Sequence, residues 1–220
     1  MQHAPSPLGE RATLAAGRIP CQGKRLTIGR TTSVSHRSVR PGHRWVTLSG
    51  MRVAVLSDTH APRFWKRCPE PVAAHVRDVD LVLHAGDVCT PDVLDELSAY
   101  APTRAVRGNN DGPEISAWGA PETLEIELDG LRVAMIHDSG AARGRLMRMR
   151  RRFPDAHLVI FGHSHIPLDE QGAGLRIFNP GSPTDRRRQP AGTMGLLEIE
   201  QGSLVRARIV EVTPRRGTRS

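Results

Sequence analysis

The feature that most constrains the fold of this chain is a series of short apolar runs, each followed at once by polar residues. The first run, Met51 to Ser57 (MRVAVLS), is rich in β-branched residues. Runs of this length and composition are typical of buried strands. Asp80 to Ala85 (DLVLHA) and His157 to Phe161 have the same character and predict two more buried strands.

Other segments complete an alternating pattern of strands and helices. Helices are predicted at Pro71 to Asp78 and at Pro91 to Ser98, where a proline near the N-terminus is favourable. Asp129-Gly130 and Gln201-Gly202 predict turns between strands. Further strands are predicted at residues 103–107, 122–128, 131–136, 175–178, 193–199 and 204–209, and a surface helix at 140–152. The order is βαβαβ first and antiparallel strands later, which predicts an α/β sandwich.

Five polar clusters come directly after predicted strands. They are Asp58-Thr59-His60, Gly86-Asp87, Gly108-Asn109-Asn110-Asp111, His137-Asp138 and Gly162-His163-Ser164-His165. Ligand sites in α/β sheets lie outside the carboxyl ends of the strands, so these clusters can converge in space. Each cluster alone is a weak signal, because an aspartate at a strand end more often caps a helix or forms a turn. The prediction rests on five clusters in order, each after a strand.

The clusters contain carboxylates, imidazoles and an amide but no thiolate. This donor set suits divalent metals of intermediate hardness such as Mn, Fe, Zn, Co or Ni. Two metals need more protein ligands than one, and a shared carboxylate is an economical bridge between them. The seven ligand-type residues at the strand ends fit that count.

The order D-x-H, G-D, G-N-x-D, H and G-H-x-H resembles the calcineurin-like metallophosphoesterase superfamily. The stretches VLSDTH, LVLHAGDV, VRGNND, FGHSH and NPGS are similar to its small single-domain bacterial and archaeal phosphodiesterase branch. The resemblance covers Met51 to about Val212. It implies a four-layer αββα sandwich, which agrees with the strand order. It also implies a phosphoesterase, in particular a phosphodiesterase, in which a hydroxide bridging two divalent metals attacks a small phosphoester.

The resemblance further implies a role for each ligand-type residue. The implied ligands are Asp58, His60 and His165 for the first metal and Asn109, His137 and His163 for the second, with Asp87 bridging the two. The implied cofactors are two divalent ions per chain, with Mn²⁺ expected first and Zn²⁺, Fe²⁺, Ni²⁺ or Co²⁺ as alternatives.

Three further residues are implied to act beside the metals. His84 matches the H-x-G-D form of the branch and either supports the ligands, faces the substrate or is a packed strand histidine. Asp111 is expected to orient its neighbours by hydrogen bonding. Asn110 stands where many relatives have a histidine that can protonate the leaving oxygen, which an amide cannot do. Arg107 or the run Arg186 to Arg188 could add a phosphate contact, although a solvated surface is the favoured interpretation of the run.

The basic charge of the chain is concentrated at its start. Residues 1–50 carry seven Arg and one Lys against one acid, whereas residues 51–220 carry 23 bases against 22 acids. A nucleic-acid partner therefore loses most of its support from charge. Residues 1–50 lack periodicity and are expected to be a disordered leader, with Met51 as the candidate true start. The domain is expected at 51–213 and a disordered tail at 214–220.

Several function classes are disfavoured. No apolar run approaches the roughly 18 residues that cross a bilayer, and three cysteines are too few for a disulfide framework. We expect a cytoplasmic protein that acts on a small phosphoester, with no membrane partner and with its oligomeric state open. The alternative is a non-catalytic metal-binding scaffold resembling the retromer subunit with the same fold. That alternative is disfavoured because every implied metal position holds a competent residue.

Overall fold

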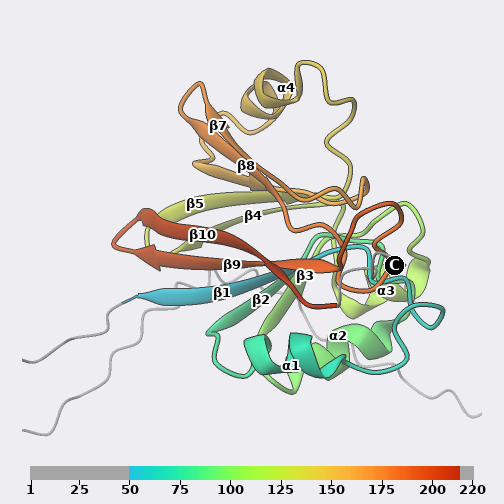
Figure 1. Ribbon diagram of the computed structural model, residues 1–220. Coiled ribbons are helices and arrows are strands. Elements are labelled where there is room, and N and C mark those ends of the chain that lie inside the picture. Colours follow the sequence, from blue (N-terminus) through green and yellow to red (C-terminus); the bar gives the residue numbers. More distant parts are fainter. Residues whose placement is uncertain (1–49, 214–220) are drawn as a thin grey trace, which may run out of the picture. The chain divides into compact units, whose positions relative to one another are not determined.

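The computed structural model describes residues 50–213, which contain two five-stranded sheets (Figure 1). The first sheet has the order β10-β9-β1-β2-β3. Its strands are β1 (Met51–Leu56), β2 (Leu81–His84), β3 (Thr103–Ala105), β9 (Thr193–Glu200) and β10 (Ser203–Glu211). Strands β1, β2 and β3 are parallel, while β9 runs antiparallel to both β1 and β10. The expected leader, up to residue 49, and the expected tail lie outside the described residues.

The second sheet has the order β4-β5-β6-β8-β7. Its strands are β4 (Thr123–Leu128), β5 (Leu131–Ile136), β6 (Leu158–Ile160), β7 (Leu168–Gly172) and β8 (Leu175–Asn179). The three central strands, β5, β6 and β8, are parallel, and the edge strands β4 and β7 pair antiparallel. Each sheet therefore contains parallel strands whose carboxyl ends can carry a common site.

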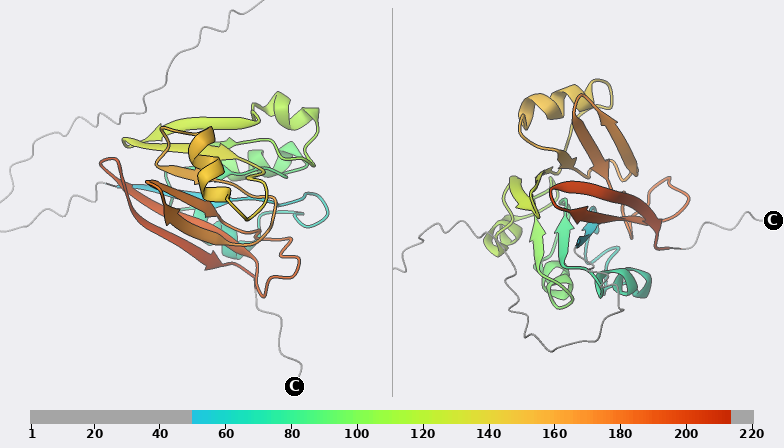
Figure 2. Two further views of the ribbon diagram at one scale, coloured as in Figure 1. Left: turned by 90° about the horizontal axis from the view of Figure 1, so that it is seen from above. Right: turned by 90° about the vertical axis from the view of Figure 1, so that its left-hand side faces the viewer.

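Helices α1 (Glu70–Val76) and α2 (Pro91–Ser98) pack on the first sheet, and α4 (Arg145–Arg152) packs on the second. In the right-hand view of Figure 2, α4 lies at the top and α1 and α2 (teal and green) lie at the bottom, with both sheets between them. Alternate residues of β1 face different layers: Val53 and Val55 lie between the sheets, whereas Ala54 and Leu56 face α1 and α2. The predicted four-layer αββα sandwich is confirmed.

Two elements were not predicted. Helix α3 (Pro113–Trp118) buries only Ile115, so it leaves almost no hydrophobic pattern. Strand β7 reads LDEQG and is largely exposed at a sheet edge, so it lacks the apolar run of a buried strand.

Helix α2 has the predicted bounds, whereas α1 and α4 are shorter than the sequence pattern suggested. Helix α4 begins at Arg145 and not at Gly140, because Gly140 and Gly144 both adopt positive φ, at 75° and 70°. Helices α2 and α4 have eight residues each. Among residues 50–213, no helix is long and apolar enough to cross a membrane.

Candidate metal centre

The seven predicted ligands lie in loops that follow the carboxyl ends of five strands in the two sheets. Asp58 and His60 follow β1, Asp87 follows β2, Asn109 follows β3, His137 follows β5, and His163 and His165 follow β6. All five strands belong to the parallel parts of their sheets, so the loops converge at one end of the sandwich.

Asp58, His60 and His165 form the first ligand group. Each offers a ligand atom, and these atoms lie within 4.8 Å of one another. The Nε2 atom of His165 is 3.4 Å from Asp58 Oδ1 and 3.3 Å from His60 Nε2. The two imidazole rings are stacked with their centroids 5.1 Å apart. These are the three residues that the sequence placed around one metal.

The second ligand group combines Asp87, His137 and His163, whose ligand atoms also lie within 4.8 Å of one another. Asn109 joins this group because its Oδ1 atom is 3.1 Å from His137 Nε2 and 2.8 Å from His163 Nδ1. The structure therefore brings together the three residues that the sequence assigned to the second metal, with the carboxylate of Asp87 beside them.

Asp87 faces both groups with a single oxygen. Its Oδ2 atom lies 3.7 Å from Nε2 of His60 in the first group and 3.3 Å from Nε2 of His137 in the second. The side chain is 1% exposed, so the carboxylate is held between the groups and away from bulk water. This is the position that a bridging ligand requires.

Five of the seven ligand residues have a backbone that non-glycine residues rarely adopt. Their positive φ angles are 58° at Asp58, 48° at His60, 56° at Asp87, 66° at His163 and 58° at His165. Such a conformation costs on the order of 1–3 kcal/mol per residue and persists only where the surroundings enforce it. The sharp turns after β1, β2 and β6 thus aim the side chains inward at a cost in stability.

Two glycines make these turns feasible. A Cβ atom at Gly162 would overlap the hydroxyl of Ser57, and one at Gly108 would overlap the carboxylate of Asp87. The loops after β1 and β6, and those after β2 and β3, therefore approach each other more closely than any larger residue would allow.

Hydrogen bonds behind the ligands fix how the imidazoles present their nitrogens. His137 Nδ1 donates to the carbonyl of Ala85 at 2.7 Å, and His165 Nδ1 donates to the carbonyl of Asp185. A carbonyl oxygen can only accept, so in the neutral rings Nδ1 carries the proton and Nε2 offers a lone pair to the centre. Ser57 Oγ likewise donates to Asp58 Oδ2 at 2.7 Å and holds that carboxylate in place.

The two buried carboxylates differ in their charge environment. Burial raises the pKa of Asp58 to about 7, although the charge of His137 and the hydrogen bond from Ser57 act in the opposite direction. Burial alone would also raise the pKa of Asp87, but His137 and the hydrogen bonds from Asn110 hold it below its usual range. The interactions with His137 and Asn110 thus outweigh the effect of burial at Asp87, whereas burial dominates at Asp58.

The donor set fits divalent cations. The carboxylate oxygens and imidazole nitrogens of each group lie within 4.8 Å of one another, and the amide oxygen of Asn109 lies beside those of the second group. All of these atoms are electron-pair donors. Buried groups of this kind are stabilised by a shared proton or a cation. Mixed imidazole and carboxylate sites are typical of Mn, Fe, Co, Ni and Zn. We conclude that both groups could hold divalent metal ions.

His84 is fully buried at the end of β2. The N–H of Gly86 donates to its Nδ1 at 3.3 Å, so Nε2 carries the proton and donates to Thr59 Oγ1 at 3.1 Å. Burial lowers the pKa of His84 to about 3, which keeps the ring neutral. This interior position, between the loops after β1 and β2, favours a positioning role over contact with substrate.

Asp111 connects the loops that follow β2 and β3. Its Oδ2 accepts from the N–H groups of Asp87 at 3.0 Å and Gly108 at 2.7 Å, and its Oδ1 accepts from the N–H of Cys89 at 2.7 Å. Asp111 therefore lies behind the ligands, at the kind of place expected for an orienting residue.

Two contacts were not foreseen from the sequence. Asn110 donates to both oxygens of Asp87, from its backbone N–H at 2.8 Å and from Nδ2 at 2.6 Å. The Sγ atom of Cys89 lies 3.6 Å from Nδ1 of His60. The spacing of Cys89, two residues after Asp87, was the available signal for the second contact.

The comparison with known sequences agrees with this geometry. The model of the calcineurin-like phosphoesterase superfamily domain matches residues 51–202. A protein named "Probable metallophosphoesterase" from Methanothermobacter thermautotrophicus is 37% identical over 148 residues, which are 66% of this chain and 85% of the relative. A protein of Methanocaldococcus jannaschii named as a phosphodiesterase is 25% identical over 144 residues, which are 60% of this chain and 83% of that protein.

A solved structure shares the fold. Vps29 from Entamoeba histolytica, complexed with Zn²⁺, matches with a TM-score of 0.59 at 24% identity and covers 74% of this chain and 100% of its own. The match of residues 51–202 spans all seven ligands that converge at the carboxyl ends of the strands. The chain therefore belongs to the calcineurin-like phosphoesterase superfamily.

Proposed function

We propose that this protein is a metal-dependent phosphodiesterase that hydrolyses a small phosphoester at a centre of two divalent ions. The observation that carries the proposal is the shared carboxylate. Asp87 Oδ2 lies within 3.7 Å of His60 in one ligand group and within 3.3 Å of His137 in the other. The phosphodiesterase relative from Methanocaldococcus jannaschii supports the choice of substrate class.

The residues divide the work of holding the ions. Asp58, His60 and His165 would hold one ion and Asn109, His137 and His163 the other, with Asp87 contacting both. Divalent ions held there would supply positive charge to phosphoryl oxygens and would lower the pKa of a bound water. The protein fixes the ligand atoms beforehand, through backbone carbonyls behind the imidazoles and a hydroxyl behind Asp58, so little reorganisation is needed during reaction.

The leaving group receives no help from a titratable side chain at position 110. Asn110 has an amide there, and its Nδ2 is already donating to Asp87. His84 is a poor substitute, because it is buried, neutral and hydrogen-bonded to Thr59. We therefore propose that the enzyme favours diesters with acidic leaving groups, for which protonation of the leaving oxygen matters least.

Manganese is the proposed native ion, with zinc, iron, nickel and cobalt as alternatives of the same donor preference. The proposed substrate is a small molecule in the cytoplasm. The nearly balanced charge of residues 51–220 supports neither a nucleic-acid nor a membrane partner.

A second candidate is a non-catalytic metal-binding scaffold. The shared fold with Vps29 proteins, one of them solved with Zn²⁺, favours it. The two candidates differ in one measurable respect, since a scaffold would bind metal and turn over no phosphoester.

The test is an assay of metal-stripped protein with each divalent ion restored in turn. The panel contains aryl and alkyl phosphodiesters and the matching monoesters, and Asp87→Asn serves as the matched control for contaminating activity. We expect aryl diesters to be hydrolysed with manganese and not without metal. Tight metal binding with no turnover of any ester by the wild type would favour the scaffold.

A further inference from the structure

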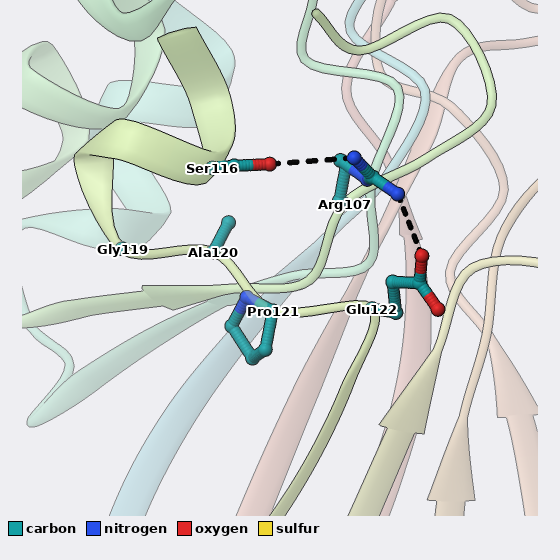
Figure 3. Close-up of a pocket in the computed structure, with 6 residues that line it drawn as sticks. All are labelled: Arg107, Ser116, Gly119, Ala120, Pro121 and Glu122. Carbon is teal, nitrogen blue, oxygen red and sulfur yellow. Dashed lines mark hydrogen bonds and ion pairs between the residues drawn. The ribbon is translucent and has the colours of Figure 1, made fainter. Parts of the chain in front are cut away.

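Four arginines near the site were candidates for contacting a phosphate, and the structure separates them. Arg107 is already engaged: it forms a 2.6 Å ion pair with Glu122 and lies 3.5 Å from Ser116 Oγ (Figure 3). It lines a cavity of about 420 Å³ with residues of the α3–β4 connection, and none of the lining residues is a candidate ligand. Arg107 therefore belongs to a different surface.

The other three arginines lie in the loop between β8 and β9. Arg186 turns back on this loop and donates from Nη1 to the carbonyl of Pro190 at 2.8 Å. Arg187 and Arg188 are both exposed. Of the three, Arg187 is distinguished by its backbone and by the charges around it.

The loop is attached to the first ligand group. Ser182 Oγ accepts from the N–H of Asp185 at 2.8 Å and donates to the carbonyl of Asp58 at 2.8 Å. The carbonyl of Asp185 accepts from Nδ1 of His165. Two residues before Arg187, the chain is thus fixed against two of the three ligands of this group.

The backbone then turns sharply at Arg187. Its φ is 49°, and the turn is closed by a hydrogen bond from the N–H of Gln189 to the carbonyl of Arg186 at 2.8 Å. The other non-glycine residues with positive φ between residues 50 and 213 fall into two classes. Three precede a glycine in hairpin turns, namely Asp129, Ala173 and Gln201, and the remainder are five ligands and Cys89. Arg187 precedes no glycine, so its strained backbone resembles that of the ligand loops.

The guanidinium of Arg187 is available and close enough to act on the ligands. Within residues 50–213, no hydrogen bond or ion pair engages its side chain. Its positive charge nevertheless lies within electrostatic range of all three ligands of the first group, Asp58, His60 and His165. An unpaired cation beside ligands for a further cation is unfavourable on its own, which points to an anion as its partner.

We propose that Arg187 contacts the substrate and binds phosphoryl oxygens on the side of the first ligand group. The planar guanidinium presents parallel N–H donors that match two oxygens of one phosphate, and an ammonium would not reproduce this geometry. The inference rests on the proposed function, because it takes the substrate to be a phosphoester. Arg187 would thus bind and position the substrate, which the seven metal ligands do not do by themselves.

The experiment measures phosphate and metal binding separately. Inorganic phosphate is titrated calorimetrically into manganese-loaded wild type, Arg187→Ala, Arg187→Lys and the neighbouring control Arg188→Ala. We expect the affinity for phosphate to fall about tenfold in Arg187→Ala, as for loss of a charged hydrogen bond at an exposed site. Arg187→Lys should recover only part of this loss, and Arg188→Ala should match the wild type. With an aryl diester, KM should rise more than kcat falls.

Manganese binding provides the readout that a merely structural role would not share. Removing a positive charge beside the ligands should leave manganese affinity unchanged or raise it a few-fold. Loss of manganese together with phosphate in Arg187→Ala would show that the residue maintains the loop, and would overturn the proposal. Wild-type phosphate affinity in Arg187→Ala, with diester hydrolysis intact, would overturn it while leaving the proposed function standing. Weakened phosphate binding in Arg187→Ala, with no ester hydrolysed by the wild type, would support the contact and reject the function.

Discussion

The two ligand groups share one carboxylate but differ in exposure and in charge. In the first group Asp58 and His165 are almost completely buried, at 0% and 1% exposed. In the second group Asn109 and His163 are exposed. Arg187 adds positive charge beside the first group, and Asn110 donates hydrogen bonds to the shared carboxylate of Asp87. The first group is therefore built more deeply into the fold, while Asn109 and His163 of the second lie at the surface.

The largest effect is expected where the two groups meet. Asp87→Asn removes the only charge that the two ligand groups share, so both groups should lose metal. Activity should fall by at least about 10³-fold, because residues that act as one catalytic unit fail together. Elemental analysis after dialysis checks occupancy. Two tightly bound ions in this variant would contradict the bridging role and would make the groups independent.

A second experiment tests the difference in burial. His165→Ala and His163→Ala should each weaken a different ion, and their effects on activity should combine less than additively if the ions act as one unit. In metal-free protein the two variants should differ in their free energy of unfolding. His165→Ala empties a buried position and should cost about 1–3 kcal/mol of unfolding free energy, whereas His163→Ala should stay within about 0.5 kcal/mol. Equal losses in denaturant titrations would remove the distinction between a buried and an exposed group.

The sequence predicted the convergence of these groups because each ligand follows a segment with the pattern of a strand. Asp58 follows β1 and His163 follows β6, and parallel strands bring their carboxyl ends together. The two elements that the sequence did not predict lack an apolar pattern. Strand β7 is polar and exposed, and α3 buries one side chain.

Roles that depend on side-chain direction could not be predicted either. Arg186, Arg187 and Arg188 are the same residue type in a row, and they are distinguished by the turn at Arg187 and by the contact of Arg186 with Pro190. Likewise, three roles were open for His84 until its partners, Gly86 and Thr59, placed it in the interior. Local pattern thus specifies which residues gather, while tertiary contacts specify what each one faces.

A third prediction concerns Asn110, which lies at the exposed side of the two ligand groups. In the wild type, turnover of diesters should decline steeply as the leaving-group pKa rises, because Asn110 cannot donate a titratable proton. Asn110→His should flatten this dependence, because it should raise the turnover of diesters with poor leaving groups by about 10²-fold or less. Asn110→Ala is the control, since it also loses the Nδ2 hydrogen bond to Asp87 but gains no acid. A flat wild-type plot, with chemistry rate-limiting, would require another acid.

The smallest effect is expected behind the first ligand group, where the hydrogen-bond partner of an imidazole can be changed by substitution. His137 in the second group is oriented by the carbonyl of Ala85, which substitution leaves in place. His60 in the first group instead has the thiol of Cys89, 3.6 Å from its Nδ1. Sulfur is a weak acceptor, so Cys89→Ser should change the affinity of the first ion by less than about tenfold, below the 10–100-fold typical of stronger partners.

Cys89→Ala separates orientation from volume, because alanine offers no acceptor to His60. If the thiol orients the ring, calorimetric titrations should show that the first group binds manganese more tightly in the wild type and in Cys89→Ser than in Cys89→Ala. The affinity for the second ion should be unaffected. An equal loss for both ions in either variant would mean that the substitution acts through the loop, which Asp111 holds at the N–H of residue 89. The two ligand groups would then respond as one rigid unit, and their difference in exposure would have no consequence for metal affinity.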